Sequence, residues 1–251
     1  MRSYHIEYAV ISSTGKIRKN NEDNFYADNH IRDDINSVEE VFFKGEVSAE
    51  DNECFAVFDG MGGEALGEVA SFVAASHTQD FLTDKDHFDE YIYELSEILN
   101  RKVIDETQAR SLVLMGTTAA MVQFHKDAVY LLNAGDSRIY RLSRRELSLL
   151  STDHIARSWA GKAITKFLGL PEEAGALSPY LAEAKYHAGD IYLICSDGVS
   201  DMLSDEEIKQ ILGQKKSPDA LCRELVDAAL DKGGVDNTTA IVCKVRQGLF
   251  K

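Results

Sequence analysis

Apolar residues along the chain either alternate with polar ones or run unbroken for a few positions, and both patterns predict β-strands. The alternation is clearest from Tyr4 to Ser12. Further strands are predicted at 25–27, 116–124, 128–134, 138–143, 147–150, 191–195 and 239–245, with weaker signals at 41–43 and at Tyr186. Because only short turns separate the strands between 116 and 150, we expect them to form an antiparallel meander.

Two longer segments, 64–82 and 87–109, place apolar residues at three- and four-residue spacing, which predicts helices with core-facing stripes. Shorter helices are predicted at 205–212, 218–230 and 155–168, and the acidic stretch 29–52 is predicted to be a loop or hairpin. This order of elements favours an α+β fold in which sheets pack on each other with helices outside. No repeat or interdomain linker is visible, so residues 1–251 are expected to form a single domain.

The chain is strongly acidic, with a formal net charge of −15 over 251 residues. That charge argues against nucleic acid as a partner, because a phosphate backbone would be repelled. No apolar run approaches the roughly 20 residues that span a bilayer, and the N-terminus lacks a signal-peptide pattern. The four cysteines form no CxxC pair, which favours a reducing, cytoplasmic compartment. A monomer is the default expectation.

Four predicted strands carry an aspartate at one end, with glycine beside it or near it. Asp59 follows the apolar run 55–58, and the other three are Asp136, Asp197 and Asp236. An aspartate next to glycine is common in turns, so each one alone fits a structural role as a turn residue or helix cap. Four together, with Asp201 close behind Asp197, favour a shared site where the strand ends converge.

Converging carboxylates repel one another unless a cation joins them. No histidine or cysteine stands at ligand-like spacing, so all-oxygen ligation favours Mg²⁺ or Mn²⁺, or else Ca²⁺, over zinc or copper. Two such ions would activate a water and clamp a phosphoryl group. Arg18 precedes Glu22 and Asp23, and its guanidinium can hold a phosphate by two parallel hydrogen bonds, although a loop arginine is more often only a surface charge.

Six stretches resemble, in the same order, the motifs of the PP2C (PPM) family of metal-dependent protein serine/threonine phosphatases, in the form seen in bacteria. They are 15–23 (GKIRKNNED), 58–63 (FDGMGG), 115–118 (MGTT), 133–140 (NAGDSRIY), 195–201 (CSDGVSD) and 236–239 (DNTT). Together they extend over nearly the whole chain. The resemblance implies a four-layer αββα sandwich, in which two antiparallel β-sheets are flanked by helix pairs.

The resemblance also implies a cluster of two Mn²⁺ or Mg²⁺ ions, with a third and weaker one. Arg18 and Asp59 would be the catalytic residues, since Arg18 would grip the substrate phosphate and Asp59 would bridge two ions. Thr118 and Asn237 would support the cluster. The implied metal ligands are Glu22, Asp23, Asp59, Gly60 through its carbonyl, Asp136, Asp197, Asp201 and Asp236, of which Asp136, Asp197 and Asp201 match the third site.

The implied activity is hydrolysis of phosphoserine and phosphothreonine in proteins by a metal-bridging water, which would reverse the action of a cognate bacterial Ser/Thr kinase. Many relatives place a histidine general acid where this chain has Met61, which cannot donate a proton. The flap segment 152–185 is shorter than usual, which affects the third ion and substrate selectivity, and the 29–52 segment is longer.

Two other functions stay open at this point. One is an enzyme of the same fold restricted to a single phosphorylated regulator. The other is a non-catalytic module that binds phosphoproteins. The complete set of carboxylates argues against the second, because a binding relic would be free to lose Asp59 or Asp236.

Overall fold

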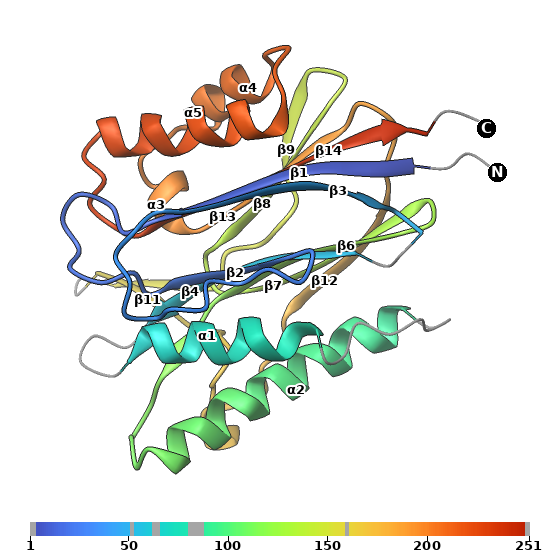
Figure 1. The fold of residues 1–251 in the computed structure, drawn as a ribbon. Helices are drawn as coiled ribbons and strands as arrows, with labels where there is room; N and C mark the ends of the chain where they lie inside the picture. The colour runs from blue at the N-terminus through green and yellow to red at the C-terminus, as the bar shows by residue number, and fades with distance from the viewer. Residues whose placement is uncertain (1–3, 51–52, 62–65, 80–87, 159–160, 249–251) are drawn as a thin grey trace.

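The computed structural model describes residues 4–50, 53–61, 66–79, 88–158 and 161–248, which form two antiparallel β-sheets packed face to face (Figure 1). In hydrogen-bonded order, the first sheet contains β3 (Val41–Ser48), β1 (Tyr4–Ser13), β14 (Thr238–Gln247), β13 (Ile191–Cys195), β8 (Arg138–Ser143) and β9 (Glu146–Leu149). The second contains β12 (Tyr180–Lys185), β7 (Ala128–Ala134), β6 (Ala119–His125), β4 (Cys54–Met61) and β2 (Asp23–Ala27), with β5 (Gly116–Thr117) paired to β4.

Helices cover the outer face of each sheet. On one side lie α1 (Gly67–Thr78) and α2 (Phe88–Ala109), and on the other lie α4 (Asp205–Leu212) and α5 (Pro218–Asp231) (Figure 1). The shorter α3 (Asp197–Ser200) and the 3-10 helix η2 (Glu172–Ala174) lie in connections. The predicted four-layer sandwich is therefore confirmed. None of the described helices is both long enough and apolar enough to cross a membrane.

The side-chain pattern of β1 explains why a central strand is buried on both faces. Ile6 and Tyr8 belong to the core between the two sheets, whereas Ala9 and Ile11 belong to the core under α4 and α5. Successive residues of a strand point to opposite faces, so each face of β1 meets a different apolar layer. Because both faces are apolar, a charged side chain in the middle of β1 would be buried without water. Charged side chains are therefore placed at the strand ends.

The predicted meander is wrong, because the chain changes sheets between β7 and β8. Gly135 at the crossing has φ +109, a conformation that favours glycine, and Asp136 follows it directly. Short turns look alike in sequence whether they join neighbours in one sheet or cross between two. The crossing places Asp136 at the junction of the sheets.

The predicted helix at 155–168 is also wrong. Its first part is a hairpin of β10 (Ile155–Ser158) and β11 (Gly161–Ile164), and Gly161 has φ +120, which an α-helix does not accommodate. The weak signal at 41–43 marks part of β3, which runs for eight residues along the edge of the first sheet. The predicted start of the first long helix at Glu64 lies outside the described residues.

A carboxylate cluster at one end of the sandwich

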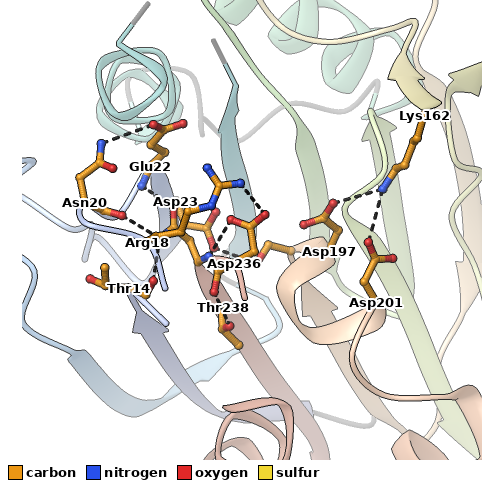
Figure 2. A network of polar contacts seen from close by, with 12 residues as sticks. Thr14, Arg18, Asn20, Glu22, Asp23, Lys162, Asp197, Asp201, Asp236 and Thr238 are labelled. Atoms are coloured by element: carbon orange, nitrogen blue, oxygen red, sulfur yellow. Dashed lines mark hydrogen bonds and ion pairs between the residues drawn. The ribbon is translucent and has the colours of Figure 1, made fainter. Parts of the chain in front are cut away.

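Carboxylates at strand ends of both sheets, among them Asp23, Asp197 and Asp236, lie near one another (Figure 2). Asp23 at the start of β2 and Asp59 near the end of β4 are register partners in the second sheet. In the first sheet, Ser13 at the end of β1 pairs with Thr238 at the start of β14, and Asp236 lies just before that strand. The predicted convergence of carboxylates is therefore present in the fold.

Asp23 lies deepest in this cluster and is fully buried. Its Oδ2 accepts a hydrogen bond from Ser196 Oγ at 2.8 Å, and its Oδ1 has no hydrogen-bond partner within the described part of the chain. Burial raises the pKa of Asp23 to about 7, and the negative charges of Asp197 and Asp236 add to that effect. A buried carboxyl with an unpaired oxygen is the kind of group that a cation would satisfy.

Asp59 is held through its backbone. Its N–H donates to Thr118 Oγ1 at 3.0 Å, and the N–H of Thr118 donates to the Asp59 carbonyl at 2.9 Å. Thr118 Oγ1 also lies 2.6 Å from Ser137 Oγ, beside Asp136. These contacts leave the carboxylate of Asp59 free for another ligand. Burial raises its pKa well above the usual range, and so do the charges of Asp23, Asp197 and Asp136.

Gly60 is required by close packing of three backbone segments. Its N–H donates to the Glu22 carbonyl at 3.1 Å. A Cβ at this position would lie 2.2 Å from the Gly67 carbonyl oxygen and 2.5 Å from that of Glu22. Any side chain would push these segments apart, so glycine fixes the backbone next to Asp59. Gly62 and Gly63, which belong to the same motif, lie outside the described residues.

Asn237 joins the first loop of the chain to the last strand. Its Nδ2 donates to the carbonyls of Thr14 at 2.9 Å and Asn20 at 2.8 Å, and its Oδ1 accepts from the Glu22 N–H at 2.8 Å. One buried amide thus positions Glu22 and the neighbouring Asp236 together. The bracing role of Asn237 stays a prediction, and these contacts support it.

Arg18 does not stand free at the site. Its Nη2 donates to Asp236 Oδ2 at 2.7 Å, and about half of its side chain, 48%, is exposed (Figure 2). This hydrogen bond raises the pKa of the Arg18 guanidinium. Glu22 lies nearby, and burial raises its pKa. Asn20 Nδ2 is 3.4 Å from both Glu22 and Glu68, which adds a carboxylate that the sequence motifs do not include.

Asp136, Asp197 and Asp201, the residues matching the third metal site, also come together. They do so around the ammonium of Lys162 on β11, which the sequence analysis did not identify. Burial raises the pKa of Asp197, and the charge of Asp136 raises it further. No sequence signal marks Lys162, because it is one of several polar residues on an exposed hairpin.

The donor set fits hard divalent cations around Asp59, since it consists of carboxylate and carbonyl oxygens with burial and mutual repulsion opposing their charge. The carboxylates are not tightly gathered. Within the described residues, one set of three His, Cys, Asp or Glu side chains has its ligand atoms all within 4.8 Å of one another. It consists of His5, Glu7 and Glu46, near the opposite end of β1.

Comparisons with known proteins show which family this chain belongs to. The sequence profile of the family described as Protein phosphatase 2C matches residues 28–230. The chain is 30% identical over 261 residues to the serine/threonine protein phosphatase PstP of Mycobacterium tuberculosis (strain CDC 1551 / Oshkosh). That match covers 96% of this chain and 45% of PstP, so the chain spans less than half of that relative's length.

Two solved structures resemble the fold closely. One is the catalytic domain of serine threonine protein phosphatase PstP in complex with two manganese ions, with a TM-score of 0.77 and 27% identity over 97% of this chain and 99% of that one. The other is PppA, described as a key regulatory component of T6SS in Pseudomonas aeruginosa. Its TM-score is 0.79, with 26% identity over 99% of this chain and all of that one.

Proposed function

Because the chain belongs to the protein phosphatase 2C family, we propose that it is a metal-dependent phosphatase acting on phosphoserine and phosphothreonine in proteins. The observation that carries the proposal is the buried carboxylate cluster around Asp59, assembled from segments near both ends of the sequence. Burial and mutual repulsion disfavour such a cluster unless cations bind it, so a purely structural role accounts for it poorly.

Two Mn²⁺ or Mg²⁺ ions fit the oxygen donors of this cluster, and the manganese-bound PstP domain supports that choice. When bound, the ions would supply an activated nucleophile and neutralise charge on the phosphoryl group. The residues that would hold them are Glu22, Asp23, Asp59, the carbonyl of Gly60, Asp197 and Asp236.

The chain's own residues would bind and orient the substrate. Arg18 uses Nη2 to contact Asp236, which leaves its other N–H groups to donate to two oxygens of a phosphate. Met61 lies at the end of β4, at the position where many relatives have a histidine that acts as general acid. Its thioether carries no exchangeable proton, so solvent would protonate the departing seryl or threonyl oxygen.

Hydrolysis of p-nitrophenyl phosphate and of a phosphothreonine peptide tests the proposal, first with Mn²⁺ and then after EDTA. We expect turnover of both substrates that EDTA abolishes and Mn²⁺ restores. A purified, folded chain without metal-dependent turnover on either would contradict the proposal and favour a phosphoprotein-binding module. Turnover confined to one regulatory phosphoprotein would favour the narrower enzyme.

Substrates in the cell would be the targets of a Ser/Thr kinase, and we infer that the kinase itself is among them. A cytoplasmic location and a monomeric state stay predictions. Size-exclusion chromatography with light scattering tests the second of these, and a dimer would overturn it.

A further inference from the structure

The chain supplies its own cation to the three carboxylates of Asp136, Asp197 and Asp201. Lys162 Nζ forms an ion pair with Asp136. It also lies 3.1 Å from Asp197 Oδ2 and 3.8 Å from Asp201 Oδ2 (Figure 2). Asp136 is almost fully buried, and the side chain of Lys162 is 29% exposed. One ammonium thus contacts all three residues that match a third metal site.

The hairpin that carries Lys162 is anchored beside these carboxylates. The N–H of His154 donates to the carbonyl of Gly135 at 2.8 Å, next to Asp136. The N–H of Thr165 donates to the carbonyl of His154 at 2.8 Å, which closes the base of the hairpin. These bonds fix where β10 and β11 leave the sandwich, so the placement of Lys162 follows from the backbone as well as from charge.

We propose that the Lys162 ammonium takes the place of a third divalent cation, so that this enzyme works with two metal ions and one internal cation. The inference rests on the proposed function. A divalent ion sharing the oxygens of Asp136 and Asp197 with the ammonium would be repelled at short range. The residues matching a third site are therefore present, but they do not fit a metal while Lys162 is in place.

The test is the number of Mn²⁺ ions bound, measured by native mass spectrometry and by calorimetric titration. Wild type should bind two ions. Lys162→Met removes the charge at similar length and should bind a third, whereas Lys162→Arg should still bind two. Lys166→Met is the matched control, because Lys166 lies close by on the same segment and donates to the Ala176 carbonyl instead. It should bind two.

Three ions on the wild type, or two on a folded Lys162→Met variant, would overturn the proposal. Assay of p-nitrophenyl phosphate hydrolysis on the same samples separates it from the proposed function. An active wild type with three ions would overturn only the role of Lys162. An inactive wild type that changes from two ions to three on Lys162→Met would overturn only the phosphatase. A wild type that binds no ion would overturn both.

A second and independent observation lies at the opposite end of the first sheet. A cavity of about 770 Å³ opens between the β8–β9 turn, the segment before β13 and the connection from α4 to α5. Its cationic lining residues are Arg144, Arg145, Lys215, Lys216, Lys244 and Arg246. The chain as a whole has a net charge of −15, so a cavity lined by six cationic residues differs in sign from the protein's overall charge.

Two of these six side chains are paired with acids outside the cavity, Lys216 with Glu224 and Arg246 with Glu7. Arg144, Arg145 and Lys215 form no ion pair within the described part of the chain. The acidic lining residue, Asp190, is 2% exposed, and its oxygens accept from Ser143 Oγ at 2.6 Å and the His187 N–H at 3.0 Å. Burial lowers the pKa of Lys244, and the neighbouring charge of Arg246 lowers it further, against the opposing charge of Glu7.

The backbone presents the two arginines in an unusual way. Arg144 and Arg145 form the two-residue turn between β8 and β9, with φ values of +50 and +69. Such turns favour asparagine and glycine, so arginine at both positions has a backbone cost without a folding benefit. The guanidinium groups are therefore better explained by binding than by the turn.

We infer that this cleft, here called the basic cleft, binds a phosphorylated acidic segment of a partner protein. Among the described residues, no Phe, Tyr or Trp lines it, so a nucleotide base would find no stacking surface there. Its concave shape fits a peptide better than a flat lipid surface. Because the cleft and the carboxylate cluster lie at opposite ends of β8, β13 and β14, a docked segment would not be the one hydrolysed.

Fluorescence anisotropy tests this inference with a labelled acidic peptide carrying two phosphothreonines, added to EDTA-treated protein so that no turnover occurs. We expect binding that weakens with salt. Arg144→Glu combined with Arg145→Glu should weaken it at least tenfold while p-nitrophenyl phosphate turnover in Mn²⁺ is unchanged. Lys102→Glu combined with Lys185→Glu is the matched control outside the cleft and should leave binding unchanged.

Equal loss of binding in both double variants would overturn the inference, because it would report net charge alone. So would binding to vesicles containing anionic lipid, or to a nucleoside triphosphate, with none to the peptide. Circular dichroism and retained turnover check that the arginine variants are folded.

Discussion

Two groups of carboxylates lie side by side at the same end of the sandwich, and they are held in different ways. Asp23 and Asp59 are positioned by neutral groups, namely the Ser196 hydroxyl and the Thr118 hydroxyl on the Asp59 backbone. Asp136 and Asp197 are paired with the Lys162 ammonium. Neutral donors fix the position of a carboxylate without cancelling its charge. An ammonium fixes the position of the carboxylate and also cancels its charge. On the proposed function, Asp23 and Asp59 would take their cations from solution, whereas Asp136 and Asp197 already contact the Lys162 ammonium.

The largest expected effect comes from the centre of the first group. Asp59→Asn keeps the shape of the side chain but removes the charge that two ions would share. We expect kcat to fall by on the order of 10³-fold and Mn²⁺ binding to weaken in parallel. Glu173→Gln, at an exposed acidic residue of η2, is the control. Near-normal turnover of Asp59→Asn would contradict the view that Asp23 and Asp59 depend on ions from solution.

Arg18→Ala removes the cation at the exposed side of the first group. Because Arg18 would bind the phosphate in the ground state as well as in the transition state, we expect KM to rise by about tenfold to a hundredfold with a smaller change in kcat. Steady-state kinetics on a phosphothreonine peptide measures both constants. If KM stayed the same, Arg18 would serve only to pair with Asp236.

Without metal, no ion pair within the described part of the chain offsets the charges of Asp23 and Asp59. The pH dependence of the free energy of unfolding of the metal-free protein tests this directly. Folded Asp23 keeps its proton up to about pH 7, whereas an unfolded aspartate loses it near pH 4. Between these values the folded state binds more protons, so its free energy of unfolding should fall as pH rises, by about 1.4 kcal/mol per pH unit for one proton. Asp59 shifts in the same direction.

Urea unfolding of EDTA-treated protein at several values between pH 4.5 and pH 7 measures this slope. Mn²⁺ should reverse it, since ions replace protons on the carboxylates. Asp23→Asn should flatten the metal-free slope. Stability that rises with pH in the absence of metal would contradict the assignment.

The smallest expected effect is that of a neutral donor. Ser196→Ala removes the hydrogen bond to Asp23 Oδ2 and the acceptor for the Thr239 N–H. We expect Mn²⁺ affinity to fall by about tenfold, as for other residues that orient metal ligands, with the fold retained. Thr107→Ala, in which a buried hydroxyl on α2 bonds only to the Val103 carbonyl, is a control. An unchanged Mn²⁺ affinity would show that Asp23 needs no orienting donor.

The sequence predicted the parts of the molecule that depend on local pattern. Apolar runs ending at Asp59 and Asp197, and one beginning shortly after Asp236, indicated both the strands and their convergence, because a strand buried on both faces leaves charge only at its ends. The change of sheets at Gly135 could not be predicted, since it depends on which partner each strand meets. Lys162 was missed for the same reason, because its role depends on where an exposed hairpin folds back.

On the proposed function, the pairing of β1 with β14 would also govern when the protein becomes active during its synthesis. Asp23 is made early and Asp236 is made 213 residues later, yet the site requires both (236 − 23). At roughly 5–20 residues per second, a ribosome needs on the order of 10–40 s to cover that interval. Throughout it, β1 lacks its central partner. On the proposed function, a nascent chain that still lacks Asp236 would therefore not yet dephosphorylate its surroundings.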